Sequence, residues 1–350
     1  HIRDFSIDSS SGMTNKGKYL AFTENGTVNS YGQSTGIDYL KDLGITHVHL
    51  LPTYDYASVD ETKLDTPQFN WGYDPQNFNV PEGSYSTDPY NGEVRVKEFK
   101  QMVQSLHNAG ISVVMDVVYG HVNSSSNFCI NQLTPSYYSR PNSSASGCGN
   151  DTATERAMNR KYIVDSVVYW ATEYHIDGFR IDQEGLFDVE TINAMVEALH
   201  AIDPSIIIYG EGWNMDSTNT TKDVKLANQG NAMDTLGCGY FSDMMRDALK
   251  GSVFDATSGY VTGGFTKLGS VLSSIIANPG WQWEPNQVVN YNSCHDNYTL
   301  FDRITITEGN EETSFADRVK QNNLAASIVM TSQGVPFIQA GEEILRSKPN

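Results

Sequence analysis

Apolar residues occur along this chain in two alternating patterns. Ile111–Val118 is apolar nearly throughout, which is typical of a buried strand in a parallel sheet. Val94–Ala109 instead has apolar residues three or four positions apart and is followed by Gly110, which predicts a helix that ends there. Because strand-like and helix-like segments alternate along the whole chain, the sequence predicts βα units and a parallel sheet.

The predicted elements add up to a barrel. Counting Ile2–Phe5 as the remnant of a first strand gives eight strands, and eight βα units with right-handed crossovers predict a closed (β/α)8 TIM barrel, an α/β fold. Residues 1–350 are expected to form this one catalytic domain, clipped at both ends, because the first strand is short and the chain stops soon after the eighth. The other strands are expected at Thr46–Leu51, Ile111–Val118, Gly178–Ile181, Ile206–Tyr209, Leu236–Tyr240, Val288–Tyr291 and Pro336–Ile338, with helices at Gly36–Leu43, Val94–Ala109, Arg156–Tyr174 and Ile192–Ala201.

Two long insertions, 52–93 and 119–151, follow the second and third predicted strands. Loops of this length are uncommon in a compact domain unless they carry function. Because both follow strands, they are expected at the C-terminal face of the barrel, where active sites of this fold lie.

Four short segments place polar residues directly after strands: D-V-V-Y-G-H (116–121), G-F-R-I-D (178–182), Y-G-E-G-W (209–213) and C-H-D-N (294–297). Adjacent strand ends lie about 5 Å apart, so Asp182 and Glu211, which follow neighbouring strands, are expected to approach each other. A carboxyl separation of roughly 5–5.5 Å suits a retaining glycosidase.

The two carboxyl groups need different environments for that chemistry. Arg180, two residues before Asp182 on the same strand face, is expected to keep Asp182 ionised as a nucleophile. Burial against an aromatic residue such as Trp213 would favour the protonated form of Glu211 that a general acid needs. A third carboxylate, Asp296, could bind sugar hydroxyls and help the other carboxyl group to hold its proton.

Composition narrows the range of partners. The net charge of −19 argues against nucleic acid and anionic membranes as partners, because phosphate binding needs clustered Lys and Arg. No stretch of about 18 apolar residues exists, so no membrane span is expected. The 19 Tyr and 5 Trp residues suit packing against sugar rings, although most aromatic residues in any chain belong to the core.

For several other polar residues the sequence allows both a structural and a functional interpretation. Asp116 is expected to be a hydrogen-bonded structural carboxylate rather than a catalyst. His47 and His49 point to the same face of one strand, as metal-binding pairs do, but without an evident third ligand core packing or sugar contact is favoured. Cys129 and Cys148 bracket a polar segment where a secreted protein could place a disulfide, and two free thiols are an equal alternative.

The four polar segments resemble the four conserved regions of the α-amylase superfamily of glycoside hydrolases. F-N-W-G-Y-D-P (69–75) is similar to the signature of type I pullulanases, which hydrolyse α-1,6 branch links, and P-E-G-S-Y-S-T-D-P (81–89) resembles the same group. The resemblance extends over essentially the whole chain. It implies that Asp182 is the nucleophile, Glu211 the general acid/base and Asp296 the stabiliser of the transition state. It also implies substrate contacts for Trp71, Tyr73, His121, Arg180, Trp213, His295 and Asn297.

Two departures from the family pattern bear on ligands and specificity. Gly120 stands where calcium-binding relatives have an Asn ligand, which argues against calcium at the usual position, and neither a metal nor another cofactor is expected to be required. Gln183 and Glu184 replace an apolar pair near the leaving-group subsites, so the preference for branch links is less firmly indicated than the chemistry.

The sequence therefore predicts a retaining hydrolase that debranches pullulan, branched starch or glycogen fragments. An α-1,4-cleaving amylase or neopullulanase-like enzyme on the same barrel is the alternative. An inactive glucan-binding barrel is a remote one, because all three carboxylates are retained. An α-glucan is the expected partner, flanking carbohydrate-binding and C-terminal β domains are expected in the full-length protein, and the expected location is extracellular or at the cell surface.

Overall fold

The computed structural model describes residues 1–215, 218–220, 223–308 and 313–348. Its backbone divides into two compact units, His1–Asn228 (unit 1) and Gln229–Asn350 (unit 2). The two are described separately below. The assignment of residues 1–350 to one domain stays a prediction.

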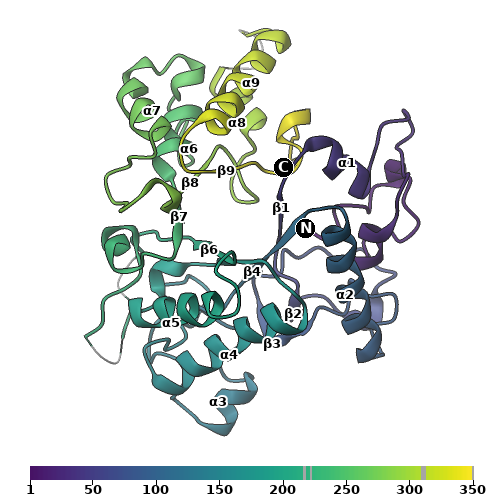
Figure 1. Cartoon of the computed structure of the whole chain (residues 1–350), viewed down its shortest axis with the longest axis vertical. Helices are drawn as coiled ribbons and strands as arrows, with labels where there is room; N and C mark the ends of the chain where they lie inside the picture. The colour runs from purple at the N-terminus through teal and green to yellow at the C-terminus, as the bar shows by residue number, and fades with distance from the viewer. Residues whose placement is uncertain (216–217, 221–222, 309–312, 349–350) are drawn as a thin grey trace. The chain divides into compact units, whose positions relative to one another are not determined.

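Unit 1 is built on four parallel strands in the order β1-β4-β5-β6. Their bounds are His47–Leu50 (β1), Ser112–Val117 (β4), Gly178–Ile181 (β5) and Ile207–Gly210 (β6). Helices α1 (Gly36–Leu43), α2 (Gly92–Asn108), α4 (Ala157–Glu173) and α5 (Val189–His200) alternate with these strands along the chain, and Figure 1 shows α2, α4 and α5 outside them. The alternation confirms the predicted α/β class.

Local sequence signals explain where these helices begin and end. The side chain of Asn91 accepts a hydrogen bond from the Glu93 N–H and begins α2, and the side chain of Asp188 accepts one from the Thr191 N–H and begins α5. Helix α1 ends at Gly44, whose φ of 73° is favourable only for glycine among common residues. Among the described residues, no helix is long and apolar enough to cross a membrane.

An aromatic cluster holds the helices of unit 1 together. Phe99 of α2 packs against Trp170 of α4 at a centroid distance of 5.5 Å and against Tyr174 at 5.1 Å. Trp170 is fully buried, and its indole N–H donates to the Phe78 carbonyl at 2.9 Å. The buried rings therefore keep their polar atoms paired, as buried polar groups must be.

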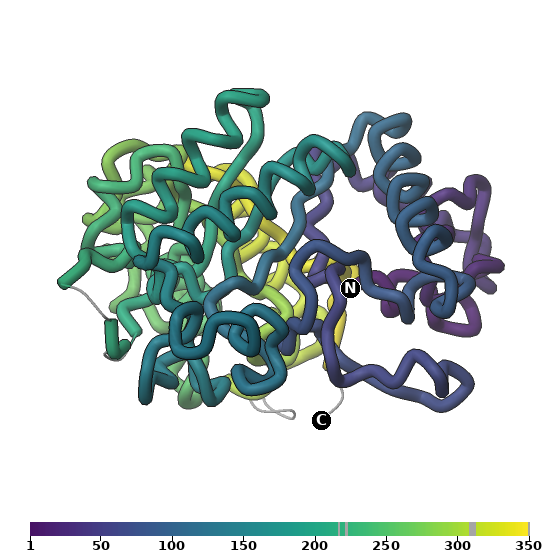
Figure 2. The backbone as a smooth tube through the Cα atoms, turned by 90° about the horizontal axis from the view of Figure 1, so that it is seen from below, coloured from purple at the N-terminus to yellow at the C-terminus, as the bar shows by residue number. Residues whose placement is uncertain are grey.

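The two insertions contain structure of their own. Insertion 52–93 forms an antiparallel pair, β2 (Tyr54–Tyr56) and β3 (Pro75–Pro81), and insertion 119–151 contains the short helix α3 (Cys129–Leu133). The path of the first insertion can be followed in indigo and blue in Figure 2. Cys129 and Cys148 are both free thiols here, which is one of the two alternatives that the sequence left open.

Unit 2 holds three parallel strands in the order β7-β8-β9: Gly239–Phe241, Val288–Tyr291 and Val335–Phe337. Its helices are α6 (Asp243–Lys250), α7 (Leu268–Ile275), α8 (Leu300–Glu308) and α9 (Phe315–Thr331). Its core joins α6, α8 and α9 through buried side chains that include Met245, Leu249, Leu300, Ile304 and Val329.

The first predicted strand is wrong. Ile2–Phe5 forms turns, in which the Phe5 N–H donates to the His1 carbonyl at 3.1 Å. The turned backbone buries Ile2 and stacks the Phe5 ring on Phe22 at 3.9 Å, so local burial replaces strand pairing. Within the described residues the parallel strands are therefore seven, four in unit 1 and three in unit 2, rather than eight.

Candidate active site

The carboxyl ends of β5 and β6 place Asp182 and Glu211 at the same level. Ile181 is paired with Gly210, and Asp182 and Glu211 are the residues that follow them. The Asp182 N–H donates to the Val117 carbonyl at 3.0 Å, and the Glu211 N–H donates to the Ile181 carbonyl at 3.2 Å. The ladder of parallel strands therefore continues into both residues and fixes their backbones.

One buried guanidinium joins these two carboxylates. Nη1 of Arg180 donates to Oδ1 of Asp182 at 2.9 Å, and its Nη2 lies 2.9 Å from Oε1 of Glu211. The same Nη1 contacts both oxygens of Asp116, at 2.8 and 3.0 Å. Bridging by one planar group brings the carboxylates close together, as a retaining glycosidase requires.

Burial and neighbouring charges of opposite sign act in opposite directions on the pKa values of Asp182 and Arg180. Burial raises the pKa of Asp182 well above its usual range; Arg180 opposes this, and the charges of Glu211 and Asp116 add to it. Burial lowers the pKa of Arg180, but the surrounding carboxylates raise it well above its usual value, so the guanidinium stays cationic. Arg180 therefore offsets part of the cost of burying the Asp182 carboxylate beside two other carboxylates.

Asp116 is a hydrogen-bonded structural carboxylate, as expected from the sequence. It is fully buried and accepts hydrogen bonds from the Tyr73 hydroxyl at 2.7 Å and from Arg180. Its Oδ2 also lies 3.2 Å from Nε2 of His49, whose Nδ1 contacts the Tyr209 hydroxyl at 3.2 Å. Through these contacts Asp116 holds Tyr73, Arg180 and His49 in place.

Tyr73 and His121 are brought to this cluster by the two insertions. The guanidinium carbon of Arg180 lies 5.8 Å from the centre of the Tyr73 ring, a cation–π distance. His121 is 2% exposed, and its Nε2 contacts the Tyr73 carbonyl oxygen at 2.7 Å. Burial lowers the pKa of His121, but Cys148, the Tyr73 carbonyl and Gln183 raise it above its usual value overall.

Gln183 has a role that the sequence did not reveal. Its φ is 49°, in the left-handed region, and its backbone N–H donates to Oε2 of Glu211 at 3.0 Å. Its side-chain amide donates to the Ser146 carbonyl at 2.8 Å and so ties insertion 119–151 to the end of β5. A left-handed residue after a strand has no sequence signal when it is not glycine or asparagine.

The two predicted tryptophans of unit 1 lie in different surroundings. Trp71 packs edge-on against Phe69, with ring centroids 6.4 Å apart. The backbone of Trp213 passes so close to Gly185 that a Cβ there would lie 2.1 Å from the Trp213 carbonyl oxygen. Only glycine permits that approach, which fixes the course of the chain after Glu211.

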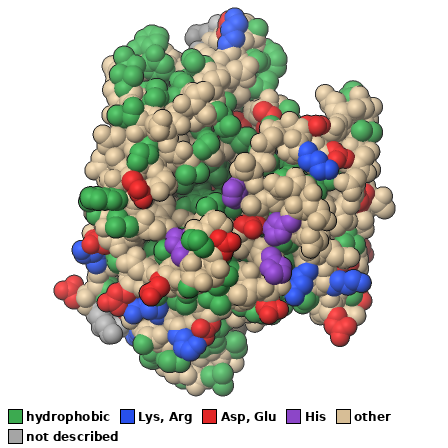
Figure 3. Space-filling model, viewed as in Figure 1, with side chains coloured by type: hydrophobic (Ala, Val, Ile, Leu, Met, Phe, Trp, Pro, Cys, Tyr) green, Lys and Arg blue, Asp and Glu red, His purple; other side chains and the backbone are tan. Residues whose placement is uncertain are grey.

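The remaining predicted residues belong to unit 2. His295, Asp296 and Asn297 follow β8 in sequence, and Nε2 of His295 lies 3.6 Å from Oδ1 of Asp296. The Asp296 side chain is 44% exposed and so accessible to a ligand. The space-filling view shows several histidine side chains exposed at the surface (Figure 3).

Insertion 52–93 contains a group of acidic residues that could hold a metal ion. Oxygen atoms of Asp55, Glu61 and Glu82 lie within 4.8 Å of one another. However, Nη2 of Arg95 binds Glu61 at 2.7 Å, and the Glu82 carboxylate accepts backbone N–H groups from Ser84 at 2.9 Å and Tyr56 at 3.2 Å. Donors of the protein itself therefore already bind Glu61 and Glu82.

The described residues offer no support for a metal ion at His47 and His49 or at Gly120. In the part of the chain that the structure describes, no such group of three ligands includes His47 or His49, and His47 instead contacts the Thr46 hydroxyl at 2.8 Å. Gly120 offers no side-chain ligand, and a Cβ there would touch the Phe187 ring at 3.4 Å.

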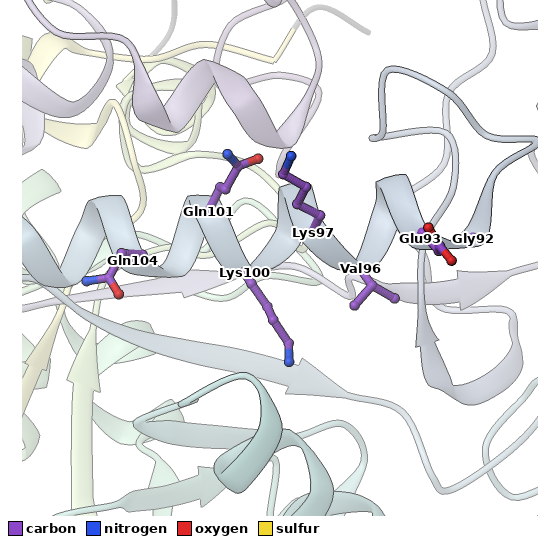
Figure 4. Close-up of a pocket in the computed structure, with 7 residues that line it drawn as sticks. All are labelled: Gly92, Glu93, Val96, Lys97, Lys100, Gln101 and Gln104. Atoms are coloured by element: carbon purple, nitrogen blue, oxygen red, sulfur yellow. The ribbon is translucent and has the colours of Figure 1, made fainter.

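A cavity of about 620 Å³ is lined by α2 residues from Gly92 to Gln104 and contains none of the site residues (Figure 4).

The chain is similar in sequence to known proteins. The family described as "Alpha amylase, catalytic domain" matches residues 22–140. A pullulanase of Bacillus subtilis is 42% identical over 361 residues, which cover 99% of this chain and 49% of that protein. The chain thus spans about half the length of this curated relative.

Solved pullulanases have the same fold. The pullulanase of Paenibacillus barengoltzii in complex with maltohexaose and α-cyclodextrin matches with a TM-score of 0.96 and 46% identity, covering 99% of this chain and 56% of that one. The type I pullulanase of Bacillus subtilis complexed with maltose matches with a TM-score of 0.95 and 41% identity, covering 99% and 50%.

The chain has the fold of solved pullulanases, and residues 22–140 match the catalytic domain of α-amylase. The relatives and solved structures named above are pullulanases, and this chain is similar to them over 99% of its length. The comparisons confirm both the resemblance noted in the sequence and the expected fold class.

Proposed function

We propose that this chain is the catalytic part of a retaining glycoside hydrolase that cleaves α-1,6-glucosidic links in pullulan, branched starch or glycogen fragments. The observation that carries the proposal is the single buried guanidinium of Arg180, which binds Asp182 and Glu211 at the ends of adjacent strands. Support for the substrate class comes from the pullulanase relatives, whose structures were solved with maltohexaose or maltose bound.

Each carboxylate has one role in the proposed reaction. Asp182 attacks the anomeric carbon while Glu211 protonates the leaving oxygen, which gives a covalent glycosyl–enzyme intermediate. Glu211 then removes a proton from water, which attacks the same carbon and releases the sugar. Asp296 stabilises the charge that develops on the sugar ring in the transition state.

The sugar contacts are proposed to come from aromatic residues and histidines. Tyr73 forms a platform at the cleavage subsite, His121 and His295 bind hydroxyl groups there, and Trp213 lines the leaving-group side. Trp71 and Asn297 complete the substrate-binding set. No metal or other cofactor takes part in any of these steps.

The partners and location are proposed on chemical grounds. An acidic protein with a net charge of −19 suits a neutral glucan. Because polymeric glucans rarely enter cells intact, the enzyme is placed outside the cell or at its surface. Flanking carbohydrate-binding and C-terminal β domains in the full-length protein agree with the partial coverage of the relatives.

Retention of configuration tests the mechanism directly. Proton NMR of the first products should show the α-anomer before mutarotation, and initial release of the β-anomer would remove Asp182 from the role of nucleophile. Asp182→Ala and Glu211→Gln should each lower kcat by several orders of magnitude. Asp165→Ala, on the exposed face of α4, is the matched control and should leave kcat unchanged.

A further inference from the structure

The segment 292–298 joins β8 to α8 and carries all three site residues of unit 2. Within it, Asn297 has a φ of 57°, in the left-handed region. Asparagine adopts that conformation more readily than any residue except glycine, so the chain can turn sharply directly after Asp296. The contacts that hold this segment therefore decide where the Asp296 carboxylate points.

Two lysines bind the segment through its backbone. The ammonium group of Lys348 donates to the carbonyls of His295 and Asn297, the latter at 2.7 Å. These are the residues on either side of Asp296. Lys250, the last residue of α6 and 1% exposed, donates to the Tyr298 carbonyl at 3.2 Å.

The beginning of the segment and Lys348 itself are also fixed. The buried carboxylate of Glu342 accepts from the Asn292 amide at 3.1 Å and from the Ser293 hydroxyl at 2.9 Å. The backbone N–H of Lys348 donates to Oδ2 of Asp302 in α8 at 2.8 Å. Asp302 of α8 therefore holds the backbone of Lys348.

We propose that Lys348 is a positioning residue for Asp296, with Lys250 as a second tie on the same segment. The inference rests on the proposed function, in which Asp296 stabilises the transition state. An ammonium group has three donors and can bind both flanking carbonyls at once, which restrains the Asp296 backbone on both sides. Because transition-state stabilisation depends on placement within about 0.5 Å, loss of this restraint lowers kcat more than it raises KM.

Steady-state kinetics of Lys348→Met on pullulan test the proposal. We expect kcat to fall at least about tenfold while KM changes by less than about twofold, and we expect Lys348→Arg, which keeps donors for both carbonyls, to recover most of the loss. Lys320→Met is the matched control, because Lys320 is an exposed lysine of α9 that pairs with Asp317. A kcat for Lys348→Met equal to that of the control would overturn the proposal.

A double-mutant cycle separates positioning from a general effect. If Lys348 acts through Asp296, Lys348→Met should cause no further loss of kcat in an Asp296→Asn background. An equal additional loss in that background would show that Lys348 acts elsewhere, and the proposal would fall.

Hydrogen exchange provides a readout that does not depend on activity. Amides of residues 293–298 should exchange at least about tenfold faster in Lys348→Met than in the unmodified protein, and at the unmodified rate in Lys320→Met. Unchanged exchange in Lys348→Met would overturn the positioning role. If the unmodified protein hydrolyses no glucan but the exchange difference is present, the proposed function fails while the structural tie stands.

Discussion

Arg180 is the residue on which the candidate site depends most. A lysine at this position would keep one positive charge but could not bind Asp182, Glu211 and both oxygens of Asp116 together. We expect Arg180→Lys to lower kcat/KM by at least about a hundredfold. Because Arg180 lowers the pKa of Asp182, its loss should also move the acidic limb of the pH profile to higher pH.

The pH dependence of kcat/KM on pullulan between pH 4 and 9 checks both expectations. Arg160→Lys is the matched control, since Arg160 also binds acidic side chains, Asp188 and Glu190, but away from the catalytic carboxylates. An acidic limb at the same pH in Arg180→Met, which removes the charge, and in the unmodified protein would contradict the electrostatic role.

Glu82 links the stability of insertion 52–93 to pH. Burial raises its pKa from 4.5 to about 7, even though backbone N–H groups of Ser84 and Tyr56 favour its ionised form. Since the folded pKa exceeds the unfolded one, the stability that Glu82 contributes is fully present below pH 4.5 and is lost as the pH rises through 7. The free energy of unfolding, relative to Glu82→Gln, should fall by about 3 kcal/mol over that window.

Urea unfolding of the two proteins at pH 4, 5.5, 7 and 8.5 measures this difference. Asp60→Asn is the control, because Asp60 is exposed and its pKa is lowered by Lys63 and Thr62 rather than raised. A difference between the unmodified protein and Glu82→Gln that stays constant with pH would contradict the assignment.

At the scale of elements, insertion 119–151 is anchored by one buried arginine. Arg140 is 3% exposed, and its guanidinium binds Oε2 of Glu155 at 3.0 and 3.1 Å and the Leu186 carbonyl at 2.9 Å. Leu186 ends the short turn Glu184–Leu186 that follows the catalytic strand β5. Arg140 therefore connects the insertion to the backbone just beyond the catalytic strand end.

Removal of Arg140 should leave a buried, uncompensated charge. We expect Arg140→Ala to lower the free energy of unfolding by about 3–5 kcal/mol, and Arg140→Met combined with Glu155→Leu to recover part of the loss. Lys161→Ala breaks an exposed ion pair with Asp165 and should cost less than about 1 kcal/mol. Equal urea midpoints for Arg140→Ala and Lys161→Ala would show that the anchor contributes nothing.

Elements with strong apolar runs could be predicted from the sequence, but non-local contacts could not. Val288–Tyr291 is a strand at its predicted bounds, whereas α5 begins three residues before the predicted Ile192 because Asp188 caps it. Strands β2 and β3 were not predicted, since they pair only with each other inside an insertion.

The residues of the candidate site also divide into those that could be predicted from the sequence and those that could not. Asp182 and Glu211 could be predicted because each directly follows a buried strand, and parallel register then brings them together. The roles of Gln183 and Lys348 could not, because they depend on a left-handed backbone and on carbonyls about 50 residues away. Such contacts exist only once the fold has formed.

At the scale of the whole molecule, the surroundings of Tyr73 and Gln183 bear on which glucosidic bond is cleaved, α-1,6 or α-1,4. Tyr73 belongs to the segment similar to the pullulanase signature, and its hydroxyl is held by Asp116 while its ring faces Arg180. A ring fixed in this way can serve as a platform for a glucose that arrives through a flexible α-1,6 link. Gln183, which could have added polar contacts favouring a linear chain, instead donates its side-chain amide to the Ser146 carbonyl.

We therefore expect maltotriose as the main product from pullulan, with kcat/KM on linear amylose at least about tenfold lower, a difference of about 1.4 kcal/mol in transition-state binding. Tyr73→Ala should lower kcat/KM on both substrates by a similar factor, because the platform serves the cleavage subsite itself. Tyr90→Ala, at a site where the side chain is 77% exposed, is the control and should change neither. Chromatography of the pullulan digest decides the matter: panose or isopanose, together with faster turnover of amylose, would transfer the assignment to an α-1,4-cleaving enzyme. The roles of Asp182 and Glu211 would survive that outcome, because the same two carboxylates retain configuration at either bond.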